Sequence, residues 1–204
     1  MSGTGGTGNR GVTSLAVSSE VVQNSLERAE RLLAAINGGV YRAMGSAAAR
    51  ALAAGKTAAK VAVAQEYAIS QGEFLKHTTN TNHHYGRASS GDMVWQIGYA
   101  GYVIPLLKFK TRPASNGRLQ TQVKRSNSAE VLQHAFKANI FGHEGVFERQ
   151  GGSRFPVQEL YGPAGPQMMA ANETVLEAVD ARVAEVFEQR LEHEINAILQ
   201  GWRG

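Results

Sequence analysis

Two glycine-containing stretches have the residue types that could bind nucleotide phosphates. The tripeptide Gly-Lys-Thr at 55–57 matches the end of a P-loop, while Gly3, Gly5 and Gly8 match the spacing of a dinucleotide-binding loop. Both loops need a strand leading into the glycines, so that backbone N–H groups converge on the phosphates. Arg50 stands where the P-loop needs its first glycine, and neither stretch follows a strand pattern. We therefore expect no nucleotide or other cofactor.

Three histidines, His77, His83 and His84, lie close together in a polar segment. Imidazoles can bind zinc, but the chain has no cysteine and these histidines lack the helical i, i+4 spacing of a zinc hydrolase. The spacing is more typical of exposed loop histidines. We predict that they bind no metal ion.

The sequence also lacks the short motifs of common hydrolases. It contains no G-x-S-x-G, no H-E-x-x-H and no cysteine nucleophile, and no pattern places two carboxylates together. We therefore expect a structural protein and not an enzyme. A hydrolase whose active site is assembled from distant residues remains an alternative.

Length and composition argue against several classes of protein. The chain has 204 residues, a length that one domain can occupy, and the absence of cysteine excludes a disulfide framework. No apolar run approaches the ~20 residues of a membrane span, and residues 1–11 lack the apolar core of a signal peptide. We expect a soluble protein with no membrane partner, made in a reducing cytoplasm.

The net charge of +4 is unevenly distributed along the chain. Residues 1–80 carry +3, residues 81–160 carry +5 and residues 161–204 carry −4. A basic middle region can attract nucleic acid, and opposite charges at two places on one chain also suit self-association. Ordinary solvated surfaces would give the same counts, so all three interpretations stay open.

Helices are predicted in the N-terminal part of the chain and again at its C-terminal end. Helical apolar spacing starts at Ser18 or Ser19 and stops at the glycines after Asn37, and a second, alanine-rich helix is predicted from Val40 to about Ala68. A capping pattern at Ser70 predicts a short third helix to about His77. A last helix, starting at Pro166 or near Thr174, carries a broad apolar stripe that includes Val183, Phe187 and Ile195.

Between the helices, residues 136–160 have the pattern of a three-stranded antiparallel meander. Three short runs, 136–141, 146–149 and 155–160, are separated by glycine-rich tetrapeptides that suit tight reversals. Pro156 cannot donate to a ladder, so we place the third run at a sheet edge. The predicted core or assembly residues of this stretch are Phe136, Ile140, Phe147, Phe155, Pro156, Val157 and Leu160.

These patterns predict an α+β fold in which the N-terminal helices and the long C-terminal helix pack on the antiparallel meander. Strand patterns at 93–98, 102–109 and 119–124 are expected to join the same sheet. Residues 1–18 are predicted as a flexible arm and 19–204 as one domain. The polar segments 78–92 and 111–118 are predicted as mobile loops that order on docking.

The meander also carries a resemblance to a known family. An alternating Ala-Phe strand, a glycine turn into Val-Phe-Glu-Arg, then Arg-Phe-Pro-Val-Gln-Glu-Leu, a proline break and a charged C-terminal helix resemble the minor tail protein Z family of tailed bacteriophages and prophages. The resemblance extends upstream through 104–109 and the alanine-rich helices, over roughly residues 20–200.

This resemblance implies a virion structural protein, a minor tail or tail completion protein in the phage tail or neck. Its expected partners are copies of itself in a homo-oligomeric ring, expected as a hexamer, together with the tail terminator, tail tube and neck or connector proteins. It implies a role in head-tail joining at the head-proximal end of the tail, close to the packaged DNA. The alternatives are a basic nucleic-acid-binding protein and a phage-encoded hydrolase.

Overall fold

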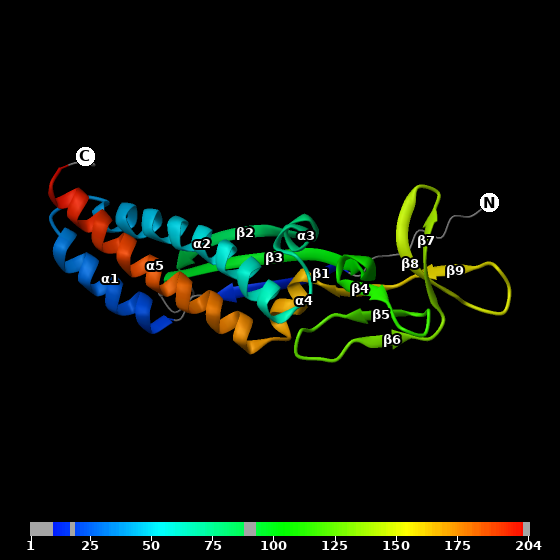
Figure 1. Cartoon of the computed structure of the whole chain (residues 1–204). Helices are drawn as coiled ribbons and strands as arrows, with labels where there is room; N and C mark the ends of the chain where they lie inside the picture. The colour runs from blue at the N-terminus through cyan, green and yellow to red at the C-terminus, as the bar shows by residue number, and fades with distance from the viewer. Residues whose placement is uncertain (1–9, 17–18, 88–92, 202–204) are drawn as a thin grey trace. The chain divides into compact units, whose positions relative to one another are not determined.

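The structure is a computed structural model that describes the backbone of residues 10–16, 19–87 and 93–201 and the side chains of residues 24–79 and 99–201. Within these residues it is an α+β fold, which confirms the predicted class. Figure 1 shows the order of the elements along the chain. The helices are α1 (Ser19–Leu33), α2 (Gly39–Glu66), α3 (Gln71–His77), η1 (Leu106–Lys108), α4 (Gly165–Ala170) and α5 (Glu173–Leu199).

The chain divides into two compact units. Unit 1 contains the described residues of 1–13 together with 60–79 and 100–172, and unit 2 contains the described residues of 14–59, 80–99 and 173–204. Each unit combines three separate segments, and four elements contribute residues to both units: β1 (Arg10–Ala16), α2, β2 (Thr78–Arg87) and β3 (Met93–Pro105). Sequence patterns within one helix or strand carry no signal of such a division.

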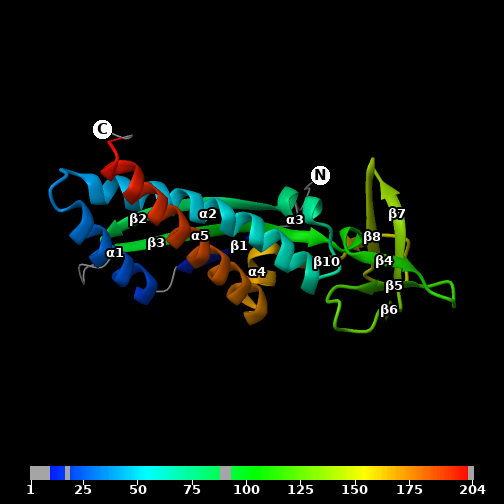
Figure 2. The same cartoon turned by 60° about the vertical axis from the view of Figure 1, so that its left-hand side comes forward.

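Helices form the core of unit 2. Helix α1 contacts α5, and both views show these helices side by side with the first part of α2 (Figures 1 and 2). The predicted stripe of α5 is buried, including Val183, Phe187 and Ile195. Its burial is the main reason that α5 forms, since an isolated helix gains little from propensity alone.

Helix α2 packs through small residues, as its alanine-rich sequence predicts. Ala43, Ala47 and Ala51 are buried, and their small side chains permit close approach of a neighbouring helix. Ser46 on α2 donates a hydrogen bond from Oγ to Oε1 of the buried Glu194 on α5, at 2.8 Å. Within the described residues, no helix is both long enough and apolar enough to cross a membrane.

The strands that the structure describes form three sheets, whereas the sequence predicted one. In the first sheet β1 (Arg10–Ala16), β3 and β10 (Tyr161–Ala164) are neighbours in that order, and β2 (Thr78–Arg87) also pairs with β3. The second sheet has the order β4 (Lys110–Pro113), β5 (Leu119–Gln122), β6 (Glu130–Leu132). The third has the order β7 (Ala135–Ile140), β8 (His143–Arg149), β9 (Val157–Glu159).

Three segments that were predicted to be irregular are therefore strands. Part of the predicted arm forms β1, most of the predicted loop 78–92 forms β2, and 111–113 belong to β4. Backbone pairing can hold a polar segment in a sheet without an apolar side-chain pattern, so composition alone assigned these residues wrongly. The predictions for residues 1–9 and 88–92 lie outside the described part of the chain.

Unit 1 contains two short helices with clear start signals. Ser70 caps α3, because its Oγ accepts a hydrogen bond from the Glu73 N–H, as the capping pattern predicts. Helix α4 follows Ala164, whose N–H donates to Oε1 of Gln167 at 2.9 Å, and Pro166 stands in its first turn. Gly165, which begins this helix, is buried tightly against Thr78, leaving no room there for a side chain.

Candidate functional site

The meander of unit 1 has the antiparallel arrangement that the sequence predicts. Phe136 of β7 pairs with Phe147 of β8, and Phe147 in turn pairs with Glu159 of β9. Paired residues of antiparallel strands point to the same face. One face of this small sheet therefore carries two phenyl rings, whose centroids are 6.4 Å apart, and a carboxylate.

A tight turn at Phe141 and Gly142 joins β7 to β8. Their φ angles of 52° and 84° both lie in the left-handed region, as a two-residue hairpin turn of type I′ requires. Glycine tolerates this conformation, but a bulky residue seldom adopts it. The Phe141 side chain is also fully exposed, with a relative accessibility of 102%. The hairpin thus presents an aromatic ring to solvent at a strained position, a combination that often marks a functional contact.

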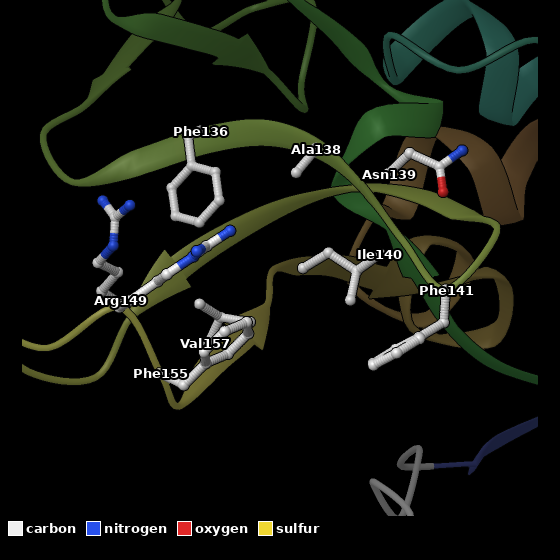
Figure 3. A pocket seen from close by; sticks show the side chains of 9 residues that line it. Phe136, Ala138, Asn139, Ile140, Phe141, Arg149, Phe155 and Val157 are labelled. Atoms are coloured by element: carbon white, nitrogen blue, oxygen red, sulfur yellow. The ribbon is translucent and has the colours of Figure 1, made fainter.

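A pocket of about 370 Å³ lies on the meander. Residues from all three strands line it, together with the hairpin turn and the loop before β9. Figure 3 shows Phe136, Ile140 and Val157 pointing into the same space. Its lining residues are Phe136, Ala138, Asn139, Ile140, Phe141, Arg149, Arg154, Phe155 and Val157. We call this the meander pocket.

Two arginines give the meander pocket its charge. The Arg149 guanidinium lies 4.8 Å from the centroid of the Phe136 ring, and that of Arg154 lies 5.8 Å from the Phe155 ring. These are cation–π contacts, which orient the guanidinium groups while leaving N–H donors available. Neither arginine forms an ion pair with any residue that the structure describes. The pocket can therefore bind a carboxylate or phosphate beside an apolar surface.

A chain of polar contacts crosses the same sheet. His143 Nε2 lies 2.8 Å from Oε1 of Glu159, and the Tyr161 hydroxyl donates to Oε2 of Glu159 at 2.6 Å. Gly145 makes room for this carboxylate, since a Cβ at that position would lie only 2.6 Å from Glu159 Oε1. Glu159 thus links β8, β9 and β10.

The hydrogen bond to Glu159, assisted by burial and by the negative charge of Glu159, raises the pKa of Tyr161 to about 12 from its ordinary value of 10.0. A pKa that is higher in the folded chain means that the neutral hydroxyl stabilises the fold. This contribution is complete below pH 10 and is lost as the pH rises from about 10 to 12. We expect the stability difference between wild type and Tyr161→Phe to shrink over that interval.

Urea unfolding of both proteins at pH 8 to 12 measures this difference. The comparison cancels the titration of the other tyrosines, including Tyr67, whose pKa burial also raises. A difference that stays constant up to pH 12 would show that the Tyr161 hydroxyl does not contribute in this way.

The predicted site residues fall into three groups. Phe147, Val183, Phe187 and Ile195 are buried; Phe136, Ile140, Val157 and Leu160 are partly exposed; Phe155 and Pro156 are exposed. Phe155 was predicted as a core or assembly residue; its side chain is 59% exposed and faces the Arg154 guanidinium, so it is not part of the core. The structure brings the meander residues together in unit 1, whereas the three α5 residues belong to unit 2.

Sequence reasoning missed the charged part of the site. Arg149 ends a predicted strand and Arg154 lies between a predicted turn and the third run, so neither is predicted as a site residue. The run 136–141 places Phe141 in a strand, one residue short of the turn. Gly142 was a partial signal for the turn, but Phe-Gly is not one of the pairs that favour a two-residue hairpin loop, so the position of the turn was missed by one residue. No sequence pattern indicated that both arginines contact phenyl rings.

The candidate metal and nucleotide residues form no comparable site. His77 Nε2 lies 3.7 Å from Oε2 of Glu73, a carboxylate whose pKa is held low chiefly by its hydrogen bond with Lys76. Among the described side chains, no group of three or more potential ligands could hold a metal ion. The side chains of His83 and His84 lie outside the described residues, as do Gly3, Gly5 and Gly8. The tripeptide at 55–57 lies within α2 and not after a strand.

Comparisons with protein-family models, curated proteins and solved structures found no match to this chain.

Proposed function

We propose that this protein is a structural component of a tailed-phage virion, a minor tail or tail completion protein that forms a ring at the head-proximal end of the tail and helps to join tail and head. The family resemblance of residues 20–200 supports this proposal. The observation that carries it is the meander, whose hairpin turn exposes Phe141 and whose loop before β9 exposes Phe155, both beside two arginines. Aromatic residues and arginine are enriched where protein–protein interfaces bind most strongly.

An exposed aromatic hairpin is costly for a protein that functions alone. Phe141 buries none of its side chain in the single chain and holds an unfavourable backbone conformation. Covering a phenyl ring by a partner contributes roughly 1.5–3 kcal/mol, which would offset this cost. A subunit whose partner covers the hairpin explains the arrangement better than an isolated protein does.

The opposite charges of two parts of the chain also suit assembly. Residues 100–172 contain nine basic and four acidic side chains, a net charge of +5. Helix α5 contains seven acidic and two basic side chains, a net charge of −5. A closed ring requires two different complementary surfaces on each subunit, and surfaces of opposite charge meet this requirement.

Deletion of the gene from the phage or prophage that encodes this chain tests the proposal. We expect separate heads and tails in electron micrographs and a loss of infectious particles, because the joining component is missing. Wild-type protein supplied from a plasmid should restore joined particles, and Phe141→Asp, which places a charge on the hairpin, should not. Fully infectious particles from the deletion would reject the joining role.

Nucleic-acid binding is the second candidate, and the basic stretch from η1 to β4 favours it. Lys108, Lys110 and Arg112 are exposed within five residues of chain and could contact phosphates. Phe109 between them is buried, so it cannot stack on bases. This candidate requires an affinity for DNA that falls steeply with salt, which a fluorescence titration at two salt concentrations measures.

A further inference from the structure

A stripe of acidic and small residues lies on the exposed surface of α5. At 3.6 residues per turn, Glu177, Ala181, Ala184 and Glu188 fall within about 60° of one another around the helix. Glu177, Ala181 and Glu188 are exposed, and Ala184 is partly exposed. The two glutamates are eleven residues apart, which corresponds to roughly 16 Å along the axis. We call this the acidic stripe.

The carboxylates of the acidic stripe are available for a partner. Two other acidic residues of α5 are already paired, Glu185 with Arg182 at 2.7 Å and Glu192 with Arg28 at 2.7 Å. Glu177 and Glu188 form no ion pair with any residue that the structure describes. The two alanines between them leave a shallow surface where a larger side chain can approach the helix.

The meander pocket has the complementary features. It carries two guanidinium groups without an acidic partner among the described residues and two protruding phenyl rings, Phe141 and Phe155. Guanidinium groups match carboxylates in charge and hydrogen-bond geometry, and the rings match the small residues between the glutamates. Each surface is exposed in a single copy of the chain.

We propose that the meander pocket of one copy binds the acidic stripe of α5 on a second copy, with Arg149 and Arg154 pairing with Glu177 and Glu188. The contact joins two different surfaces, so it is heterologous and can continue from copy to copy until a ring closes. This inference rests on the proposed function, for which it names the contact between subunits. Since ion pairs contribute to it, the association should weaken as salt rises.

Two double variants, each replacing charged side chains by neutral glutamine, test the two surfaces one at a time. Arg149→Gln with Arg154→Gln blocks only the pocket, and Glu177→Gln with Glu188→Gln blocks only the stripe. Each is expected to weaken self-association by about 100-fold or more in sedimentation equilibrium, because a partly buried charge loses its partner. Lys110→Gln with Arg112→Gln is the matched control, since it removes two exposed positive charges of unit 1 outside the pocket and should associate like wild type. Unchanged thermal unfolding shows that each variant is folded.

Mixing the two blocked proteins gives the decisive result. One still has an intact stripe and the other an intact pocket, so the mixture should form a 1:1 pair, twice the chain mass of 21.9 kDa, and nothing larger. The proposal is overturned if the pocket variant associates as well as the control, or if the mixture forms no pair. A wild-type chain that stays monomeric at about 1 mM also overturns it.

This result is independent of the deletion phenotype. If the deletion abolishes infectivity while the pocket variant still assembles, the subunit contact is wrong and the joining role stands. If the variants lose self-association but deletion particles are infectious, the contact is right and the joining role is wrong.

Discussion

Replacing Phe187 by alanine is expected to lower the free energy of unfolding by about 3–5 kcal/mol. The Phe187 side chain is 2% exposed in α5, and Val183 and Leu191, one turn away on either side, are also buried. Removing the ring leaves a cavity that neighbouring side chains fill only in part, so lost burial and lost packing both contribute. Urea unfolding followed by circular dichroism measures the change.

Phe141→Ala is the matched control for this experiment. It removes the same atoms from a position where the ring is fully exposed, and it also removes a bulky residue from a left-handed backbone position. We expect its stability to lie within about 0.5 kcal/mol of wild type. Equal losses in the two variants would contradict the burial of Phe187 in unit 2.

Gly101→Ala is expected to destabilise the protein by about 1–3 kcal/mol. Gly101 is buried in β3, and an added Cβ would overlap the carbonyl oxygen of His77 and lie 3.3 Å from Cδ of Pro166. The obstructing oxygen belongs to the backbone, so no side-chain rotation can relieve the overlap. The backbone of β3 or of the end of α3 must therefore move to accommodate the added Cβ.

Gly45→Ala provides a control with the opposite sign. Gly45 lies inside α2, and a Cβ there would meet no atom within 4 Å. Alanine should therefore stabilise the helix by up to about 1 kcal/mol through its higher propensity. The midpoint of thermal unfolding should rise in Gly45→Ala and fall in Gly101→Ala. A Gly101→Ala protein as stable as wild type would contradict the close approach of β3 to His77.

The sequence predicts the helices and the meander well because their patterns are local. The stripe through Met44, Ala48, Leu52 and Val63 repeats at helical spacing, and all four side chains are buried. The capping pattern at Ser70 and the strand runs after residue 135 likewise depend on residues close in the chain. These signals suffice for the α+β class.

Longer-range pairing accounts for what sequence reasoning missed. β2 has the sequence TTNTNHHYGR, which is polar and turn-like, yet it pairs with β3 through backbone groups that every residue possesses. The partition of strands into three sheets depends on register between distant segments, such as Tyr161 with Pro105, that no local pattern specifies. The site was only half predicted for the same reason, since the cation–π contact of Arg149 depends on which strand lies beside it.

The interleaving of the two units has a consequence for biosynthesis. Neither unit is a continuous stretch of chain, since β1, α2, β2 and β3 each supply residues to both, and unit 2 takes α5 from the segment after residue 172. During translation α1 and α2 therefore emerge long before α5, the helix that contacts α1. Because segments of the two units alternate along the chain, neither unit can fold completely before part of the other has been synthesised, unlike sequential domains. Unit 1 can therefore be complete only after residue 172 has been synthesised, and unit 2 only after α5 has been synthesised.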